Sequence, residues 1–389
     1  MKICYTIAEY NPFHNGHQKH VDYMRNVLGA DVIIVIASGN FTQRGEPAVL
    51  NKFTRAKTAV LGGVDLVIEL PTVFATANAE TFAKGAIKII KDLGLGGTLC
   101  FGVESGKKED YISLATAMND ESKEFKSSLK NYLEKGVSLA KAKFMAVKDT
   151  GKEFDENLIS SPNNILGLEY VKAVLSMNAE LEIEPMLRTG NHNDKTLKKG
   201  FTSATSIREA LKLGKNKKLK TVLPKFSFSE LKTYPKNFDK LILAEVIRTD
   251  AKTLAKTPDC TEGLENRIKA LVKDSKTVTE LIDKVSTKRY TNTRISRILT
   301  ANLLGIKDST VKDCLKEKLY AKVLCVKESC KDVIALLNET AEIPILTRKS
   351  DVMKLNKTAK ECFEIDVLAN DMHNLIADEK TNENHMVIV

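Results

Sequence analysis

The stretch that decides the fold reads Ile3-Cys4-Tyr5-Thr6-Ile7-Ala8-Glu9-Tyr10-Asn11-Pro12-Phe13-His14-Asn15-Gly16-His17. Residues 3–8 are apolar or β-prone and too few for a helix, so they indicate a buried strand. Asn11-Pro12 ends that strand, and residues 18–28 place apolar side chains on one helical face. The stretch therefore predicts a strand, a turn and a helix, with two histidines where the helix begins.

The beginning of that helix is a predicted phosphate site. A helix N-terminus presents unpaired N–H groups and the positive end of the helix dipole. His14 and His17 add donors for the charge that develops on a transferring phosphoryl group. Gly16 lacks a side chain where a nucleotide would approach closely. The alternative interpretation is that both histidines are ordinary surface residues that cap a helix.

The first half of the chain alternates strand and helix patterns. After the first strand, apolar runs predict strands at 32–37, 65–70, 98–103 and 181–187. The segments between them predict helices at 53–62, 78–93 and 163–176, and one or two more within 106–150. Such alternation is typical of an α/β fold with a Rossmann-like parallel sheet, in which ligands bind beyond the carboxyl ends of the strands.

The second half of the chain carries mainly helical patterns. They cover 228–248, 263–285 and 292–304, and a mixed tail follows at 320–375. A chain of 389 residues is long for a single core. We therefore predict a nucleotide-binding domain at 1–220 and a mainly helical domain at 221–389, the latter binding RNA.

The composition is typical of a cytoplasmic protein without a membrane span. No apolar run reaches the roughly 18 residues that a span needs, and the seven cysteines are dispersed without a CxxC pair. His14, His17 and His20 are spaced like metal ligands, but they lack acidic or cysteine companions and drift off one helical face. No protein-bound metal is expected.

Positive charge is concentrated between residues 191 and 250. This segment has 14 Lys and Arg against 6 Asp and Glu, a balance of +8 within a chain total of +10. Lys212, Lys215, Lys217, Lys218 and Lys220 are its densest part. Such a block attracts polyanions, and RNA is the default partner of a cytosolic enzyme. A solvated Lys-rich surface is the equally supported alternative.

A second motif, Ser203-Ala204-Thr205-Ser206-Ile207-Arg208, begins another predicted helix at 204–213. Hydroxyl groups at a helix start cap it and can also hold phosphate, and Arg208 can reach the same anion. Together with the His14–His17 turn, this motif resembles the HxGH and ISSTxxR-like signatures of the nucleotidyltransferase superfamily, which bracket ATP.

Further motifs resemble one branch of that superfamily, the bacterial tRNA(Met) cytidine acetate ligases. They are Ala8 to His17, Ser38-Gly39-Asn40-Phe41-Thr42-Gln43-Arg44-Gly45-Glu46-Pro47-Ala48, Asp65-Leu66-Val67-Ile68-Glu69-Leu70-Pro71, Phe101-Gly102-Val103-Glu104 and Ser161-Pro162-Asn163-Asn164-Ile165-Leu166-Gly167. The resemblance implies that ATP and acetate form acetyl-adenylate. The acetyl group then passes to N4 of the wobble cytidine (C34) of elongator tRNA(Met), giving N4-acetylcytidine.

The resemblance also implies site residues. His14, His17, Ser203, Ser206 and Arg208 would be catalytic, and Mg²⁺ would arrive on the phosphates of ATP. The implied ATP contacts are Ile7, Ala8, Glu9, Tyr10, Asn11, Pro12, Phe13, His14, Asn15, Gly16, His17, Gln18, Lys19, His20, Gly102, Asn163 and Arg188.

Basic residues outside these motifs are candidates for contacts with acetate, phosphate or RNA. Arg44 lies in a loop after the second strand, and Lys52 and Arg55 follow at the next helix start. Arg294 and Arg297 lie on a predicted amphipathic helix, and Lys215, Lys217 and Lys218 belong to the basic block.

Two other functions stay open. One is a small-metabolite adenylyltransferase of the same fold, although such chains are typically shorter. The other is a non-catalytic RNA-binding protein with a relic nucleotide site, which the intact histidine pair disfavours.

Overall fold

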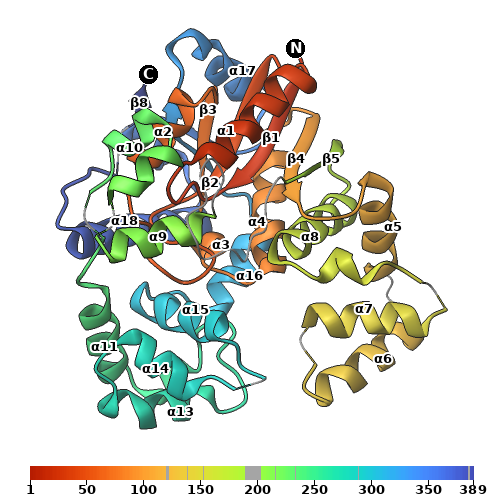
Figure 1. The fold of residues 1–389 in the computed structure, drawn as a ribbon, viewed down its shortest axis with the longest axis vertical. Helices are drawn as coiled ribbons and strands as arrows, with labels where there is room; N and C mark the ends of the chain where they lie inside the picture. The colour runs from red at the N-terminus through yellow and green to blue at the C-terminus, as the bar shows by residue number, and fades with distance from the viewer. Residues whose placement is uncertain are drawn as a thin grey trace.

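The computed structural model describes residues 1–119, 122–137, 139–151, 153–188, 203–214, 216–232, 234–287, 289–383 and 386–389. Its centre is a sheet with the strand order β5-β4-β1-β2-β3-β6-β7, and β8 pairs with β6 (Figure 1). The strands are β1 Ile3–Ala8, β2 Val32–Ser38, β3 Leu66–Leu70, β4 Gly97–Val103, β5 Leu181–Leu187, β6 Ala321–Val326, β7 Ile345–Leu346 and β8 Val387–Ile388.

The order of the strands reverses at β1. β2 and β4 both pair with β1 in parallel, on its two sides. β3 continues the parallel sheet beyond β2, and β5 continues it beyond β4. Such a topological switch point leaves room for a ligand beyond the carboxyl ends of the two central strands. The predicted parallel sheet is confirmed.

The central strands β1 and β2 are mainly apolar and buried because helices cover both faces of the sheet. Alternate side chains of β2 enter different cores. Ile33 and Val35 pack with the helices that follow β1 and β2. Ile34 and Ile36 pack on the opposite face, in a core shared with the helices around β4. This burial on both faces explains why the sequence shows continuous apolar runs.

Helices and helical turns connect and flank the strands of the first half. They are α1 Asn15–Asp22, the π-helical turn η1 Tyr23–Val27, α2 Lys52–Leu61, α3 Thr72–Ala75, α4 Ala79–Asp92, α5 Lys108–Met118, α6 Lys123–Glu134, α7 Leu139–Asp149, η2 Glu156–Ile159, α8 Pro162–Ser176, α9 Ala204–Lys212, η3 Asn216–Thr221 and α10 Lys225–Ser229.

A group of helices between residues 238 and 303, here called the helical body, has a core of its own. Ile242, Leu264, Leu281 and Ile298 are among its buried side chains. It lies at the bottom of Figure 1. Its elements are α11 Phe238–Arg248, α12 Ala251–Leu254, α13 Leu264–Leu271, η4 Val272–Asp274, α14 Val278–Val285 and α15 Asn292–Leu303.

The end of the chain returns to the sheet. β6 runs antiparallel to β3, so the sheet extends past the predicted domain boundary at residue 220; the division there stays a prediction. Within the described residues, no helix is long and apolar enough to cross a membrane. The remaining elements are α16 Asp308–Lys316, η5 Glu328–Cys330, α17 Asp332–Thr340, η6 Lys349–Lys354 and α18 Lys357–Ala377.

The helix predicted at 228–248 is not continuous. α10 ends at Ser229 and α11 begins only at Phe238. Pro235 lies in the intervening segment, where it lacks the N–H that a helix needs. The predicted helix at 263–285 is likewise divided, into α13 and α14, with a short 3₁₀ turn between them.

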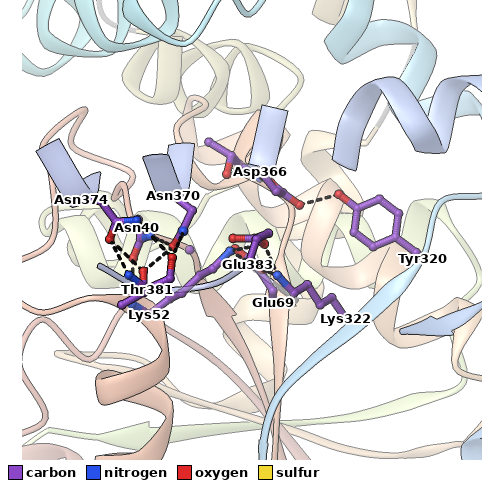
Figure 2. A network of polar contacts seen from close by, with 12 residues as sticks. Asn40, Lys52, Glu69, Tyr320, Lys322, Asp366, Asn370, Asn374, Thr381 and Glu383 are labelled. Carbon is purple, nitrogen blue, oxygen red and sulfur yellow. Dashed lines mark hydrogen bonds and ion pairs between the residues drawn. The ribbon is translucent and has the colours of Figure 1, made fainter. Parts of the chain in front are cut away.

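A buried network of charged side chains fastens the end of the chain to the sheet (Figure 2). Lys52 Nζ lies 2.7 Å from Glu69 Oε1 and 2.6 Å from Glu383 Oε1. Lys322 contacts Glu383 as well and lies 3.5 Å from Glu69 Oε2. All four side chains are at most 5% exposed. Strand β3, strand β6 and the C-terminal segment are thereby joined through α2.

We expect the change Lys52→Met to lower the free energy of unfolding by about 3–5 kcal/mol, because it removes one of the two lysines that balance two buried carboxylates. Lys57→Met on the same helix is the matched control. The Lys57–Glu230 pair is 44% and 29% exposed, and losing it should cost less than about 1 kcal/mol. Urea denaturation of both variants measures the difference, and equal losses would contradict the proposed role of the network.

Candidate active site

A cavity of about 240 Å³ lies beyond the carboxyl ends of β1 and β4. This switch-point cavity is where the topology places a ligand site. Thirteen of the residues predicted to contact ATP line it. They are Ile7, Ala8, Glu9, Tyr10, Asn11, His14, Gly16, His17, Lys19, His20, Gly102, Asn163 and Arg188.

His14 and His17 form a reciprocal cap at the start of α1. Nδ1 of His14 accepts the backbone N–H of Gly16 at 3.0 Å. Nδ1 of His17 accepts the backbone N–H of His14 at 3.3 Å. The rings stack with their centroids 3.7 Å apart. Because Nδ1 is an acceptor in both rings, each neutral imidazole carries its proton on Nε2. Each ring therefore keeps one N–H donor for a ligand.

Both rings are neutral at pH 7. Burial, together with the positive charges of Arg188 and Arg208, lowers the pKa of His14 from 6.5 to about 3. Burial and the neighbouring His14 also hold the pKa of His17 well below its ordinary value. The alternative of ordinary surface histidines is therefore wrong for His14, which is only 2% exposed.

Two predicted glycines have a local structural reason. A Cβ atom on Gly16 would lie 2.8 Å from Cε1 of His14, so glycine leaves room for the capping ring. A Cβ atom on Gly102 would lie 3.1 Å from two side-chain carbons of Arg188. Gly16 was predicted to leave room for a nucleotide and Gly102 to contact ATP, whereas the atoms that both glycines accommodate here belong to neighbouring site residues.

The Ser203–Arg208 motif adjoins the histidine turn. Ser203 caps α9 by accepting the N–H of Ser206 at 3.2 Å, and the two hydroxyl oxygens are 2.9 Å apart. Arg208 Nη1 donates to the carbonyl of Asn11 at 3.1 Å. Ala204 lines the cavity. The two motifs, far apart in the sequence, are therefore in contact. Ser203, Ser206 and Arg208, which we predicted to be catalytic, are buried and are not part of the described cavity lining.

Several lining residues were not predicted. The predicted Asn163 lines the cavity from α8. Leu166 lies three residues after Asn163 on this helix and Tyr170 four residues after Leu166, and both also line the cavity. That periodicity was a usable signal. Thr6 lines the cavity from β1, directly before the predicted Ile7 and Ala8. The other unpredicted lining residues are Phe82, Phe101, Pro162, Met186 and Ala204.

Four residues of the predicted ATP turn do not line the cavity, namely Pro12, Phe13, Asn15 and Gln18. The carbonyl of Phe13 accepts the Ser227 hydroxyl at 2.6 Å, and its ring is buried. The N–H of Asn15 donates to the carbonyl of Val222 at 3.2 Å. These contacts fasten the turn to the segment around η3 and α10.

Lys52 and Arg55 do not belong to the described lining of the switch-point cavity. Lys52 belongs to the buried network, and Arg55 is 2% exposed. The Arg55 guanidinium donates to the carbonyls of Glu9, Ser38 and Gly39. The expectation that both basic side chains shape the pocket or meet RNA is therefore corrected. Each side chain is buried and pairs with groups of this chain that are distant in the sequence.

The other basic candidates are placed as follows. Arg44 lines the cavity. Arg294 donates to the carbonyl of Asp259 at 2.8 Å, and Arg297 lies 3.5 Å from the Asp259 carboxylate, so both support the helical body. Lys217 and Lys218 belong to η3. Lys218 is exposed, and only the backbone of Lys217 is described. Lys215 lies outside the described residues.

A family model described as HIGH Nucleotidyl Transferase matches residues 1–386. The tRNA(Met) cytidine acetate ligase of Clostridium novyi (strain NT) is 37% identical, and the match covers 97% of this chain and 96% of that protein. The protein of the same name from Acetivibrio thermocellus is 34% identical over 96% of this chain and 94% of its own length. The chain belongs to the tRNA(Met) cytidine acetate ligase family.

Two solved structures extend the comparison within this ligase family. Thermotoga maritima TmcAL in an apo form superposes with a TM-score of 0.94 at 29% identity. The same protein bound with alpha-thio ATP superposes with a TM-score of 0.91 at 27% identity. Both matches cover all of each chain. The resemblance that the motifs indicated, and the α/β fold it implied, are confirmed.

We expect the stability of this ligase-family member to fall below pH 6.5, and His14→Asn to reduce the fall. The folded-state pKa of His14, about 3, lies below the ordinary 6.5. The unfolded chain therefore binds this proton at a higher pH than the folded chain does. The stability that neutral His14 contributes is complete above pH 6.5 and is lost as the pH falls toward 3. Between pH 7 and pH 5 this amounts to roughly 2 kcal/mol.

Asparagine keeps the helix cap but does not titrate. Urea denaturation of both proteins at pH 7 and pH 5 measures the difference. An unchanged pH dependence in His14→Asn would show that His14 already titrates normally.

Proposed function

We propose that the protein is an ATP-dependent tRNA(Met) cytidine acetate ligase. Acetate attacks the α-phosphate of ATP to give acetyl-adenylate and pyrophosphate, and the acetyl group passes to N4 of the wobble cytidine (C34) of elongator tRNA(Met). One observation carries the proposal: the His14–His17 turn and the Ser203–Arg208 motif adjoin at a single cavity. The names of the relatives support the choice of acetate and tRNA(Met).

The activation step rests on donors that are oriented before the substrate arrives. Nε2–H of His14 and of His17 donates to the phosphate oxygens as charge develops. Neutral rings suit this task, because they donate hydrogen bonds to the phosphates without the free-energy cost of burying a charge before the substrate binds. Ser203, Ser206 and Arg208 steady the departing pyrophosphate. Mg²⁺ arrives with the phosphates of ATP, since it keeps several waters and needs few protein ligands.

The remaining lining residues divide between the nucleoside and the phosphates. Gly102 and Asn163 lie at the carboxyl end of β4 and the start of α8, where the adenosine is held. The Asn163 amide already donates to Glu104 at 3.0 Å, which orients its oxygen for the ribose or the base. Arg188 supplies a planar fork for phosphate. Acetate then binds on the side of Gln43 and Arg44.

The tRNA approaches over the segment that fastens the histidine turn. Lys218 and Lys220 are exposed on η3, which precedes the Val222 carbonyl bonded to Asn15. Their charges therefore lie beside the start of α1 and attract the phosphate backbone of RNA near the mouth of the cavity.

One assay tests this function against its two alternatives. The protein is incubated with ATP, labelled acetate and tRNA(Met), with His14→Ala and His17→Ala as matched variants. We expect acetate-dependent pyrophosphate release and labelled tRNA from the native protein. Each variant should lose about 10²–10³-fold in pyrophosphate release, because one preorganised donor is missing, while its circular dichroism spectrum is unchanged.

The outcomes separate the candidates. Pyrophosphate release without labelled tRNA would favour the small-metabolite adenylyltransferase. Binding of RNA without any pyrophosphate release would favour the non-catalytic protein. Full activity in both histidine variants would remove the proposed site.

We expect Lys218→Glu combined with Lys220→Glu to weaken tRNA binding. The slope of the logarithm of the binding constant against the logarithm of salt concentration should become shallower by the equivalent of about two phosphate contacts. Lys327→Glu combined with Lys331→Glu is the control of equal charge change. The backbone N–H of Lys327 donates to Asp65, just before β3, at the opposite edge of the sheet. Filter binding at several salt concentrations measures both, and equal weakening would contradict the proposed surface.

A further inference from the structure

Glu9 is the one Asp or Glu among the described residues that line the switch-point cavity. It follows β1 directly and is half-buried. Its Oε1 accepts the backbone N–H of Gln43 at 2.9 Å. Its charge, after burial, helps to raise the pKa of Tyr170. Gln43 also lines the cavity, so the carboxylate and the group that holds it both belong to the cavity wall.

The second oxygen of this carboxylate is open. Within the described part of the chain, Glu9 Oε2 has no hydrogen bond and Glu9 forms no ion pair. A carboxylate held at one oxygen and open at the other is suited to accept a proton from a bound group.

The other basic side chains that line the cavity form contacts of their own or carry a positive charge. Nδ1 of His14 and Nδ1 of His17 accept backbone N–H groups, so neither ring has a lone pair left. His20 Nε2 lies 3.1 Å from Cys100 Sγ. Lys19, Arg44 and Arg188 are cations. Among the described lining residues, Glu9 is the one carboxylate, and its Oε2 is an open acceptor.

We propose that the Glu9 carboxylate accepts the proton that the cytidine amine releases during acetyl transfer. This inference rests on the proposed function. The N4 lone pair attacks the acetyl carbon, a C–N bond forms, and the carbonyl C–O bond to the adenylate phosphate breaks. AMP leaves with that electron pair. The proton from N4 moves to Glu9 Oε2 and then to solvent, so atoms and charge balance.

A base is needed at this step because the exocyclic amine of cytidine is a weak nucleophile. Its lone pair is delocalised into the ring, and attack becomes favourable as the proton departs. General base catalysis contributes about 10²–10⁴-fold in rate. Adenylate formation, by contrast, releases no proton from acetate at neutral pH and needs no base. The two half-reactions therefore differ in their dependence on Glu9.

The position of this carboxylate depends on the helical body. Gln43 belongs to a tight loop closed by the Phe41–Pro47 bridge. The carbonyl of Gly45 at its tip accepts the hydroxyls of Ser296 at 2.8 Å and Thr300 at 2.7 Å. Gly45 has a φ of 73°, and a Cβ atom there would lie 2.5 Å from the backbone of α15. Helix α15 thus holds the loop that orients Glu9.

The test compares the two half-reactions in Glu9→Gln. The amide still accepts from Gln43 but cannot take up a proton. Acetate-dependent exchange of labelled pyrophosphate into ATP reports adenylate formation. Single-turnover transfer from enzyme-bound acetyl-adenylate to tRNA(Met) reports the second step. We expect transfer to fall about 10²–10⁴-fold and exchange to fall much less.

Glu184→Gln is the matched control, because Glu184 accepts a hydrogen bond from Tyr23 at 2.6 Å and does not line the cavity. It should keep the native ratio of the two rates. Equal losses in both half-reactions of Glu9→Gln, or unchanged transfer, would overturn the proposal. Absence of exchange in the native protein would instead contradict the proposed function itself.

Discussion

The carboxyl edge of the sheet depends on one buried guanidinium. Arg55, on α2, donates to the main-chain carbonyls of Glu9, Ser38 and Gly39, and to that of Leu50 at 3.0 Å. Carbonyls that leave the ends of parallel strands have no partner in the sheet, and leaving them buried and unpaired is costly. One side chain therefore satisfies the turns after β1 and β2 together and sets where each chain segment goes next.

The geometry of the site is determined by the carboxyl edge of the sheet. The turn after β1 presents Glu9 and then the histidine cap, and the turn after β2 presents Gln43 and Arg44. Arg208 donates to the Asn11 carbonyl from outside, so the turn is held from two directions. The two imidazoles stay neutral because they are buried beside cations. Their function is to donate hydrogen bonds, and the reciprocal cap fixes which nitrogen does so.

The sequence predicted the elements whose signals are local. The strand at residues 3–8 and the helix that begins at Ser203 follow from runs and caps that involve only neighbouring residues. The roles of Lys52 and Arg55 did not follow. At a helix start they resemble an anion site, but the carboxylate of Glu383 and the carbonyl of Glu9 are distant in sequence. The antiparallel pairing of β6 with β3 was likewise decided by tertiary contacts.

The most direct test of the account is a crystal structure of this chain with a non-hydrolysable ATP analogue. We expect the nucleotide in the switch-point cavity, with phosphate oxygens within about 3.5 Å of Nε2 of His14 and of His17, and with the adenosine toward Gly102 and Asn163. A nucleotide bound elsewhere, or phosphates that face away from both imidazoles, would contradict the assignment of the site.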